Sequence, residues 1–62
     1  MNKYIEFFND IDFGNIQYYK NVKYRISKEN GTTYILNHGK EPFLVPKKFE
    51  NKDYRIGDIL VD

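Results

Sequence analysis

The chain has 62 residues, with ten basic side chains, nine acidic ones, one histidine and no cysteine. Without cysteine it has neither a disulfide nor a thiolate metal site, and its length allows one domain over residues 1–62. The formal net charge of +1 argues against a protein that coats DNA, because such proteins carry a large basic excess. Aromatic residues make up 18% of the chain, so we expect aromatic burial, or self-association, to supply its stability.

The sequence contains no run of 18 apolar residues, which a membrane-spanning helix would require. Its first ten residues also lack the basic, apolar and small-residue order of a signal peptide. The sequence therefore predicts a cytoplasmic protein, and no membrane partner is expected.

Residues 2–13 carry an apolar stripe at the i, i+3, i+4, i+7 spacing that is typical of an amphipathic helix. The stripe consists of Tyr4, Phe7, Phe8 and Ile11. An N-cap residue precedes the stripe and a glycine follows it, so the pattern favours a short helix. The competing interpretation is an edge strand over residues 3–8.

Residues 16–28 alternate apolar and polar side chains in their second half and are predicted to form a strand. Asn30–Gly31 follows, and both residue types tolerate the positive φ that a two-residue type I′ hairpin loop requires. That loop places Ile26 opposite Ile35, and directly opposed residues share one face of a hairpin. The inward face is predicted to hold Tyr24, Ile26 and Ile35, and the outward face Lys23, Arg25, Ser27, Tyr34 and Leu36.

A second hairpin is predicted after the first. His38–Gly39 begins its turn, and residues 42–45 form a short strand that starts on a proline, as an edge strand permits. Its register stays open, because a loop of either two or four residues fits the pattern.

The last part of the chain combines a polar turn with a closing strand. Residues 46–51 are predicted to form the turn, with Phe49 directed inward. A strand within residues 54–62, entered through Gly57–Asp58, follows it. Its apolar triplet 59–61 is predicted to be paired and covered on both faces, because an exposed apolar run is unfavourable in water.

Together these elements predict a mainly β (α+β) fold. Four to five short antiparallel strands follow a short N-terminal helix. So few residues can cover a core only if the sheet curls on itself, and a small, partly open barrel is the expected result.

Positions 18–50 contain a characteristic order of residue types. It comprises an aromatic strand end, an Asn-Gly turn, a Tyr-initiated strand, a glycine turn, a short strand and a phenylalanine in a tight helical turn. These positions are Tyr24, Asn30–Gly31, Tyr34, Gly39, Phe43 and Phe49. The stretch resembles small bacteriophage and prophage proteins with an SH3-like barrel, over about half the chain. The resemblance implies an SH3-like fold and a mobile-element origin, but no activity, because that group is functionally mixed.

Few side chains are suited to catalysis or metal binding. Asp10 and Asp12 do not fit a calcium loop, because Gly14 falls where the EF-hand pattern needs an oxygen ligand. His38 lies in a predicted turn and has no nucleophile or carboxylate partner evident from the sequence. We therefore predict a protein that is not an enzyme and that binds no metal and no cofactor.

The outward face of the central hairpin mixes aromatic and basic side chains, and tyrosine and arginine are enriched at protein-binding hot spots. The predicted partner-binding residues are Tyr18, Tyr19, Lys23, Arg25, Tyr34 and Leu36, with Lys20 beside them. The leading hypothesis is a non-enzymatic protein-binding module, encoded by a phage or another mobile element. It would modulate or inhibit a host or defence protein by steric docking.

Other interpretations of the sequence stay open. The same face is suited to nucleic acid, because tyrosines stack on bases and cations neutralise phosphates, although the net charge near zero argues against it. It is equally typical of an ordinary solvated surface. A third hypothesis is a homodimer in which the C-terminal strand pairs with its copy, as exposed strand edges permit.

Overall fold

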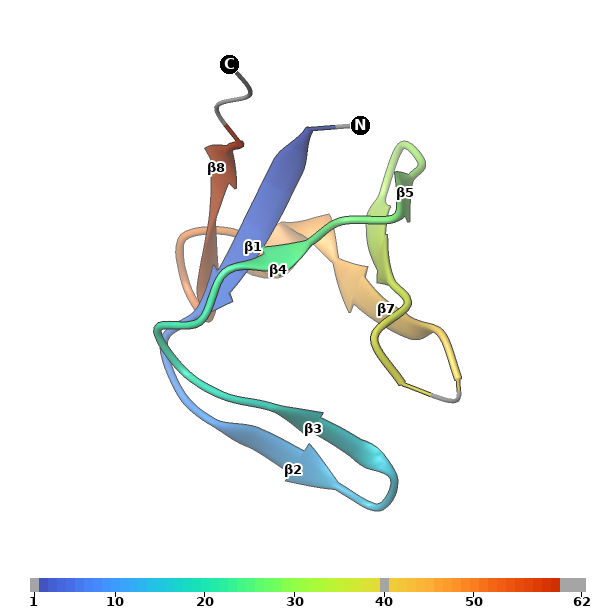
Figure 1. Cartoon of the computed structure of the whole chain (residues 1–62). Coiled ribbons are helices and arrows are strands. Elements are labelled where there is room, and N and C mark those ends of the chain that lie inside the picture. The colour runs from blue at the N-terminus through green and yellow to red at the C-terminus, as the bar shows by residue number, and fades with distance from the viewer. Residues whose placement is uncertain (1, 40, 60–62) are drawn as a thin grey trace.

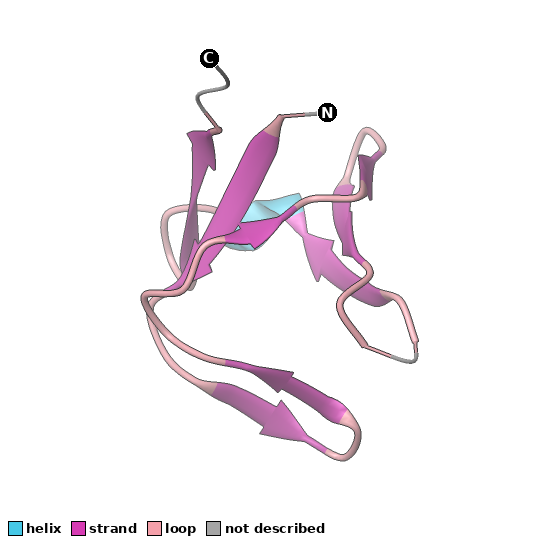
Figure 2. Ribbon diagram, in the orientation of Figure 1, coloured by secondary structure: helices cyan, strands magenta, loops and turns pink. Residues whose placement is uncertain are grey.

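The computed structural model describes residues 2–39 and 41–59, which are mostly short strands (Figure 2). The strands are β1 (Lys3–Phe7), β2 (Ile11–Phe13), β3 (Ile16–Tyr18), β4 (Tyr24–Arg25), β5 (Lys28–Glu29), β6 (Thr33–Leu36), β7 (Phe43–Pro46) and β8 (Tyr54–Asp58). One 3-10 turn, η1 (Lys47–Phe49), connects β7 to β8. The predicted mainly β class is confirmed.

Two three-stranded antiparallel sheets form the body of the molecule, in the orders β4-β1-β8 and β5-β6-β7. Strands β2 and β3 pair only with each other and project as a separate hairpin (Figure 1). The outer strands β7 and β8 do not pair with each other. The sheets therefore stay open, and they do not close into the predicted barrel.

The predicted N-terminal helix is wrong. The alternative strand over residues 3–8 is confirmed by β1, but this strand lies at the centre of its sheet and not at an edge. Ile5 and Phe7, two residues apart, are buried, whereas Phe8 is half-exposed. Ile5 is not part of the helical stripe, and together with Phe7 it has the two-residue spacing of a strand. Strand formation wins because β1 lies between β4 and β8, which hydrogen-bond its backbone on both sides, and because core residues of the other sheet cover its apolar face.

The predicted strand over residues 16–28 is divided into β3, β4 and β5. Asn21 has a φ of 62° and ends the first part in a turn, where its N–H donates to the Phe7 carbonyl (3.2 Å). After β4 the chain leaves one sheet for the other. Ile26 N–H donates to Lys3 in the first sheet (3.0 Å), and Ser27 N–H donates to Ile35 in the second (2.9 Å).

The register of the central hairpin also differs from the prediction. Lys28 pairs with Ile35, and Asn30 N–H donates to the Thr33 carbonyl (3.0 Å), so the turn is centred on Gly31 and Thr32. Neither Asn30 nor Gly31 has a positive φ. Instead of a type I′ loop, the Asn30 side chain accepts a hydrogen bond from Thr32 N–H (2.9 Å) and stabilises an Asx turn.

This register reverses the predicted faces of β6. Ser27 and Lys28 both lie opposite Ile35, which is the arrangement of a β-bulge. The extra residue places Ile26 on the same side as Tyr34 and Leu36. Tyr34 and Leu36 are therefore buried, at 5% and 0% exposure, whereas Ile35 is partly exposed.

The second hairpin has a longer loop than either predicted alternative. Leu36 pairs with Phe43, so six residues, 37–42, separate the two strands. The strand itself is Phe43–Pro46 rather than 42–45. Pro42 therefore lies just before it, where its missing N–H costs the ladder nothing.

The C-terminal part confirms the tight turn and corrects the closing strand. Phe49 lies in η1 and is 38% exposed rather than directed inward. The closing strand begins at Tyr54 and contains Gly57, instead of starting there. Ile59 N–H extends the ladder by donating to the Asn2 carbonyl (2.8 Å). The rest of the predicted triplet, residues 60–61, lies outside the described residues.

Aromatic rings from both sheets and from the β2–β3 hairpin fill the core, as predicted. Its buried members are Ile5, Phe7, Tyr18, Ile26, Tyr34, Leu36, Val45 and Tyr54. Phe7 is central, with its ring centroid 5.6 Å from that of Tyr18 and 6.1 Å from that of Tyr54. Among the described residues, no helix has the length and apolar character needed to cross a membrane.

Candidate functional site

The structure separates the six predicted partner-binding residues into two groups. Tyr18, Tyr34 and Leu36 lie in the core, at 3%, 5% and 0% exposure. The predicted outward positions of Tyr34 and Leu36 are wrong because the bulge at Ser27–Lys28 turns them inward. Tyr18 is buried by stacking on Phe43, with 5.1 Å between ring centroids. These three side chains stabilise the fold and present no surface to a partner.

The other three predicted residues, Tyr19, Lys23 and Arg25, are exposed on or beside the sheet β4-β1-β8. Lys23 Nζ lies 5.1 Å from the ring centroid of Tyr4, and Arg25 Nη2 donates to the Asn2 side-chain oxygen (3.1 Å). The two cations thus lie near an aromatic residue that the predicted helix had placed elsewhere. Both cations are exposed.

Tyr4 is part of a polar group on this same outer face, which we call the outer cluster: Tyr4, Glu6, Lys23 and Arg55. Arg55 Nε donates to Glu6 (2.7 Å) and Arg55 Nη2 donates to the Tyr4 hydroxyl (3.3 Å). The hydrogen bond and charge of Glu6 raise the pKa of Arg55. The outer cluster follows from pairing, because Glu6 faces Arg55 directly across β1 and β8.

A different and mainly apolar hollow of about 130 Å³ lies between β7, η1 and the end of β1. We call it the β7 groove. Its lining residues are Phe7, Ile11, Phe43, Leu44, Val45, Pro46, Phe49, Asp53 and Tyr54. Asp53 is the one charged residue in this described lining. Leu44 and Phe49 form the exposed rim, at 59% and 38% exposure.

Local structure explains why the rim is exposed. Leu44 alternates with the buried Val45 along β7, so its side chain points away from the core. Pro46 ends the strand, and the chain turns through η1 with Phe49 as its last residue. Lys48 Nζ lies 5.1 Å from the Phe49 ring centroid and covers one part of the ring.

The base of the β7 groove is fixed by Tyr54. Its hydroxyl donates to the Pro46 carbonyl (2.7 Å), which joins the start of β8 to the end of β7. Burial is the main cause that raises the pKa of Tyr54 to about 12, and the charges of Glu50 and Asp53 add to it. The phenol therefore stays protonated and keeps its role as a donor at neutral pH.

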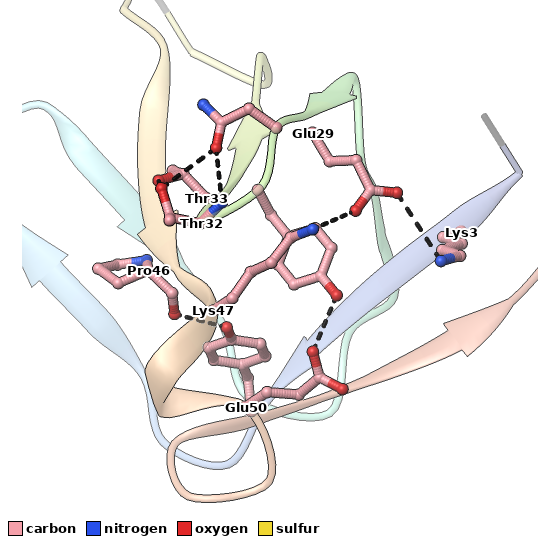
Figure 3. Close-up of polar contacts among 10 residues, drawn as sticks. Lys3, Glu29, Thr32, Thr33, Pro46, Lys47 and Glu50 are labelled. Atoms are coloured by element: carbon pink, nitrogen blue, oxygen red, sulfur yellow. Dashed lines mark hydrogen bonds and ion pairs between the residues drawn. The ribbon is translucent and has the colours of Figure 1, made fainter.

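A second polar group, the inner cluster, holds η1 against the sheet β5-β6-β7 (Figure 3). It consists of Glu29, Tyr34, Lys47 and Glu50. Lys47 Nζ is 2.5 Å from Glu29 and 4.9 Å from the Tyr34 ring centroid, and the Tyr34 hydroxyl donates to Glu50 (2.8 Å). These contacts position the turn that carries Phe49. Burial, with the hydrogen bond to Glu50, raises the pKa of Tyr34 far above its usual value.

The residues considered for chemistry have structural contacts. Asp10 Oδ1 accepts a hydrogen bond from Lys20 N–H (2.8 Å), so it joins the two sides of the β2–β3 hairpin at its base. His38 is exposed in its loop, as predicted, and its Nε2 lies 2.9 Å from the Arg25 carbonyl. Among the described residues, no group of three or more histidine, aspartate or glutamate side chains is placed to hold a metal ion.

Comparison with known proteins leaves the surface to be interpreted on its own geometry. No protein-family model, no curated protein and no solved structure matches the chain. Sequence reasoning missed the β7 groove because it expected Phe49 to point inward and assigned no role to Leu44. The proline that ends β7 was the available signal, since it has no N–H for a ladder and therefore indicates an edge strand.

Proposed function

We propose that the chain is a non-enzymatic protein-binding module and that the β7 groove is its docking surface. The observation that carries this proposal is the exposure of Leu44 and Phe49 around a hollow with a single charged residue. Exposed apolar side chains that line a hollow together are typical of binding sites, whereas isolated ones are common on any surface. The partner would bury an apolar side chain between Leu44 and Phe49.

The groove is well suited to steric docking because its walls are fixed before binding. Tyr54 holds its base to Pro46, and Lys47 and Glu50 hold η1 in place. A surface that is already ordered loses little conformational entropy when a partner binds. Rigid apolar docking needs no catalytic group, which agrees with the function predicted from the sequence.

We further propose that the two sheets have an SH3-like arrangement and that the protein originates from a mobile element. An SH3-like arrangement is supported by the segment 24–29, which passes from one three-stranded sheet to the other, and by η1 before the last strand. If the resemblance over residues 18–50 reflects ancestry, the protein comes from a phage or another mobile element. Its partner would then be a host or defence protein that it modulates or inhibits.

Selection of displayed random peptides on the immobilised protein tests the groove. Peptides that bind the wild type are expected to bind a Leu44→Glu variant about tenfold more weakly or worse, because a charge enters the apolar rim. The matched control is Val22→Glu, which changes another exposed apolar residue, 41% exposed and outside the groove. Equal binding to both variants and to the wild type would contradict the proposal.

A second candidate function is nucleic-acid binding, which one observation supports. Residues 18–28 contain four cations and no acid, and within them Tyr19 is 53% exposed. An exposed ring among cations is suited to stacking on a single strand. Fluorescence anisotropy with labelled oligothymidylate at low salt tests this. Binding that a Lys23→Gln, Arg25→Gln double variant loses would favour it, and no binding at low salt would end it.

A further inference from the structure

The free edges of the two sheets differ in how well they are blocked. On β7, Lys47 N–H donates to Thr32 (2.8 Å), and the antiparallel alternation then turns the backbone of Leu44 toward the open edge. The prolines on either side of it, Pro42 and Pro46, have no N–H, and the Pro46 carbonyl accepts from Tyr54. Leu44 is thus the only residue of β7 whose outward N–H can meet another strand. Prolines at edges are a common protection against unwanted pairing.

The free edge of β8 has no such protection at its centre. Phe8 N–H donates to Asp53 (3.0 Å) and Ile59 N–H donates to Asn2 (2.8 Å), which fixes the alternation along β8. The N–H and C=O groups of Ile56 and Asp58 therefore point away from β1. In residues 2–39 and 41–59 these outward groups have no hydrogen bond. Figure 1 shows β8 at the margin of its sheet, with β1 on one side only.

We propose that two copies of the chain pair through β8, antiparallel and about a two-fold axis at Gly57. In this register Ile56 of one copy lies opposite the partner's Asp58, and Asp58 lies opposite the partner's Ile56. The two outward N–H groups and two outward carbonyls of each copy are then all used, in four hydrogen bonds. The pairing begins at Ile56, because the carbonyl of the preceding outward residue, Tyr54, already accepts a hydrogen bond from Asn51 N–H (2.6 Å).

Side chains on the outer face favour a second copy as the occupant. A Cβ on Gly57 would overlap Cζ of Tyr4, so the Tyr4 ring covers this glycine and its hydroxyl end approaches the edge. Across the axis two glycines oppose each other, and the two tyrosine rings come side by side over them. Such self-complementarity is what a two-fold interface requires.

The charge of Arg55 favours a two-fold axis at Gly57 over one at Arg55. An axis at Arg55 would place two arginines directly opposite, which is unfavourable on one face of a sheet. With the axis at Gly57, Arg55 lies opposite the partner's Ile59, and its guanidinium remains bonded to Glu6 in its own chain. The paired segment is short, so we expect a weak dimer that forms with rising concentration.

Sedimentation equilibrium from about 10 µM to about 1 mM tests the proposal with two substitutions at one position. Asp58→Ala keeps the outward N–H, and Asp58→Pro removes it without removing a hydrogen bond to β1. We expect the wild type and Asp58→Ala to dimerise, and Asp58→Pro to stay monomeric with a cooperative thermal transition. A wild type that is monomeric throughout, or an Asp58→Pro variant that dimerises equally, would overturn the proposal.

Amide hydrogen exchange of the wild type tests the same pairing without any substitution. The outward amides of Ile56 and Asp58 are expected to exchange more slowly in the concentrated sample, whereas that of Leu44 on the other edge is unchanged. Equal rates for Ile56 at both concentrations would overturn the pairing. The proposed binding role of the β7 groove does not depend on this result, because the pairing uses neither Leu44 nor Phe49.

Discussion

The inner and outer clusters use the same chemistry in two different environments. Each has a tyrosine, a lysine near its ring, an ion pair and a hydrogen bond from or to the tyrosine hydroxyl. In the inner cluster Tyr34 is buried, at 5% exposure, and the side chains of Lys47 and Glu29 are about a quarter exposed. In the outer cluster the Glu6 side chain is 14% exposed, but its partner Arg55 is 54% exposed. Buried polar groups depend on their partners, whereas exposed ones can exchange them for water. The inner cluster should therefore contribute to stability, and the outer cluster much less.

Truncation of the two tyrosines is the strongest way to break this comparison. Tyr34→Ala is expected to lower the free energy of unfolding by about 3–5 kcal/mol, because it empties part of the core and leaves Glu50 without its donor. Tyr4→Ala should cost far less, since that ring lies on the surface of the sheet. Urea unfolding followed by circular dichroism measures both. Similar losses for the two variants would refute the distinction.

The Tyr34 result also separates the structure from the sequence-based prediction. A side chain in an outward docking face could be truncated without loss of stability. The register places it in the core instead, so a Tyr34→Ala variant that folds like the wild type would speak for the predicted face.

Alkaline pH is expected to have the next largest effect. The pKa of Tyr54 is raised to about 12 in the folded protein, mainly by burial, and that of Tyr34 is raised further. A raised pKa contributes stability that is complete below the unfolded value of about 10 and is lost as the pH rises through the folded value. Stability should thus fall between about pH 10 and pH 12.

Tyrosinate absorbance during unfolding at fixed alkaline pH measures this effect. Tyr54→Phe should weaken the pH dependence, and Tyr4→Phe is the control from the outer cluster. If the two variants change the alkaline unfolding midpoint equally, buried hydroxyls are not its cause.

The two lysines give a smaller and sharper test. Lys47→Met should lower the free energy of unfolding by about 1 kcal/mol, a value typical of a partly shielded cation over an aromatic ring. It should also weaken the loss of stability in acid. Lys47 lowers the pKa of Glu29, chiefly through its hydrogen bond, and this stability is present above about pH 4.3 and is lost as the pH falls through the folded value.

Lys23→Met is the matched control for Lys47→Met, because Lys23 lies at a similar distance from the ring of Tyr4. Chemical unfolding at pH 7 and at pH 3–4 compares the two variants. An acid response that Lys47→Met leaves unchanged would show that Glu29 is not held by Lys47 in solution.

The sequence predicts which segments form strands and turns better than it predicts which side of each strand faces the core. The alternation over 22–26, the Asn-Gly turn and the polar segment 46–51 indicated β segments, a turn and a helical turn close to where they lie. The mainly β fold class followed from these segments, and the aromatic core followed from the composition. These features are local, because each depends on residues within one or two turns of the chain.

The candidate site could not be predicted in the same way. Its geometry depends on one extra residue at Ser27–Lys28, which changes the inward side of β6 and is not visible as a turn signal. The exposure of Leu44 depends on which face of β7 meets the core, and this is set only when the two sheets assemble. Tyr4 and Gly57 are 53 residues apart, so only the pairing of β1 with β8 brings them together.

The smallest effect is expected from the ion pair of the outer cluster. Arg55→Met removes the bond to Glu6 and the bond to Tyr4, but Arg55 is exposed, so water can take the place of its guanidinium. Its change in unfolding free energy should lie within the error of the measurement and should vanish in high salt, because exposed charges are screened. The double variant Arg55→Met, Glu6→Gln tests the coupling directly.

A coupling as large as the effect of Lys47→Met would mean that the outer cluster is shielded in solution. The proposed β8 pairing with a second copy would shield it in this way at high concentration. Repeating the measurement on dilute protein separates these cases: coupling that disappears on dilution belongs to the dimer, and coupling that persists belongs to the single chain.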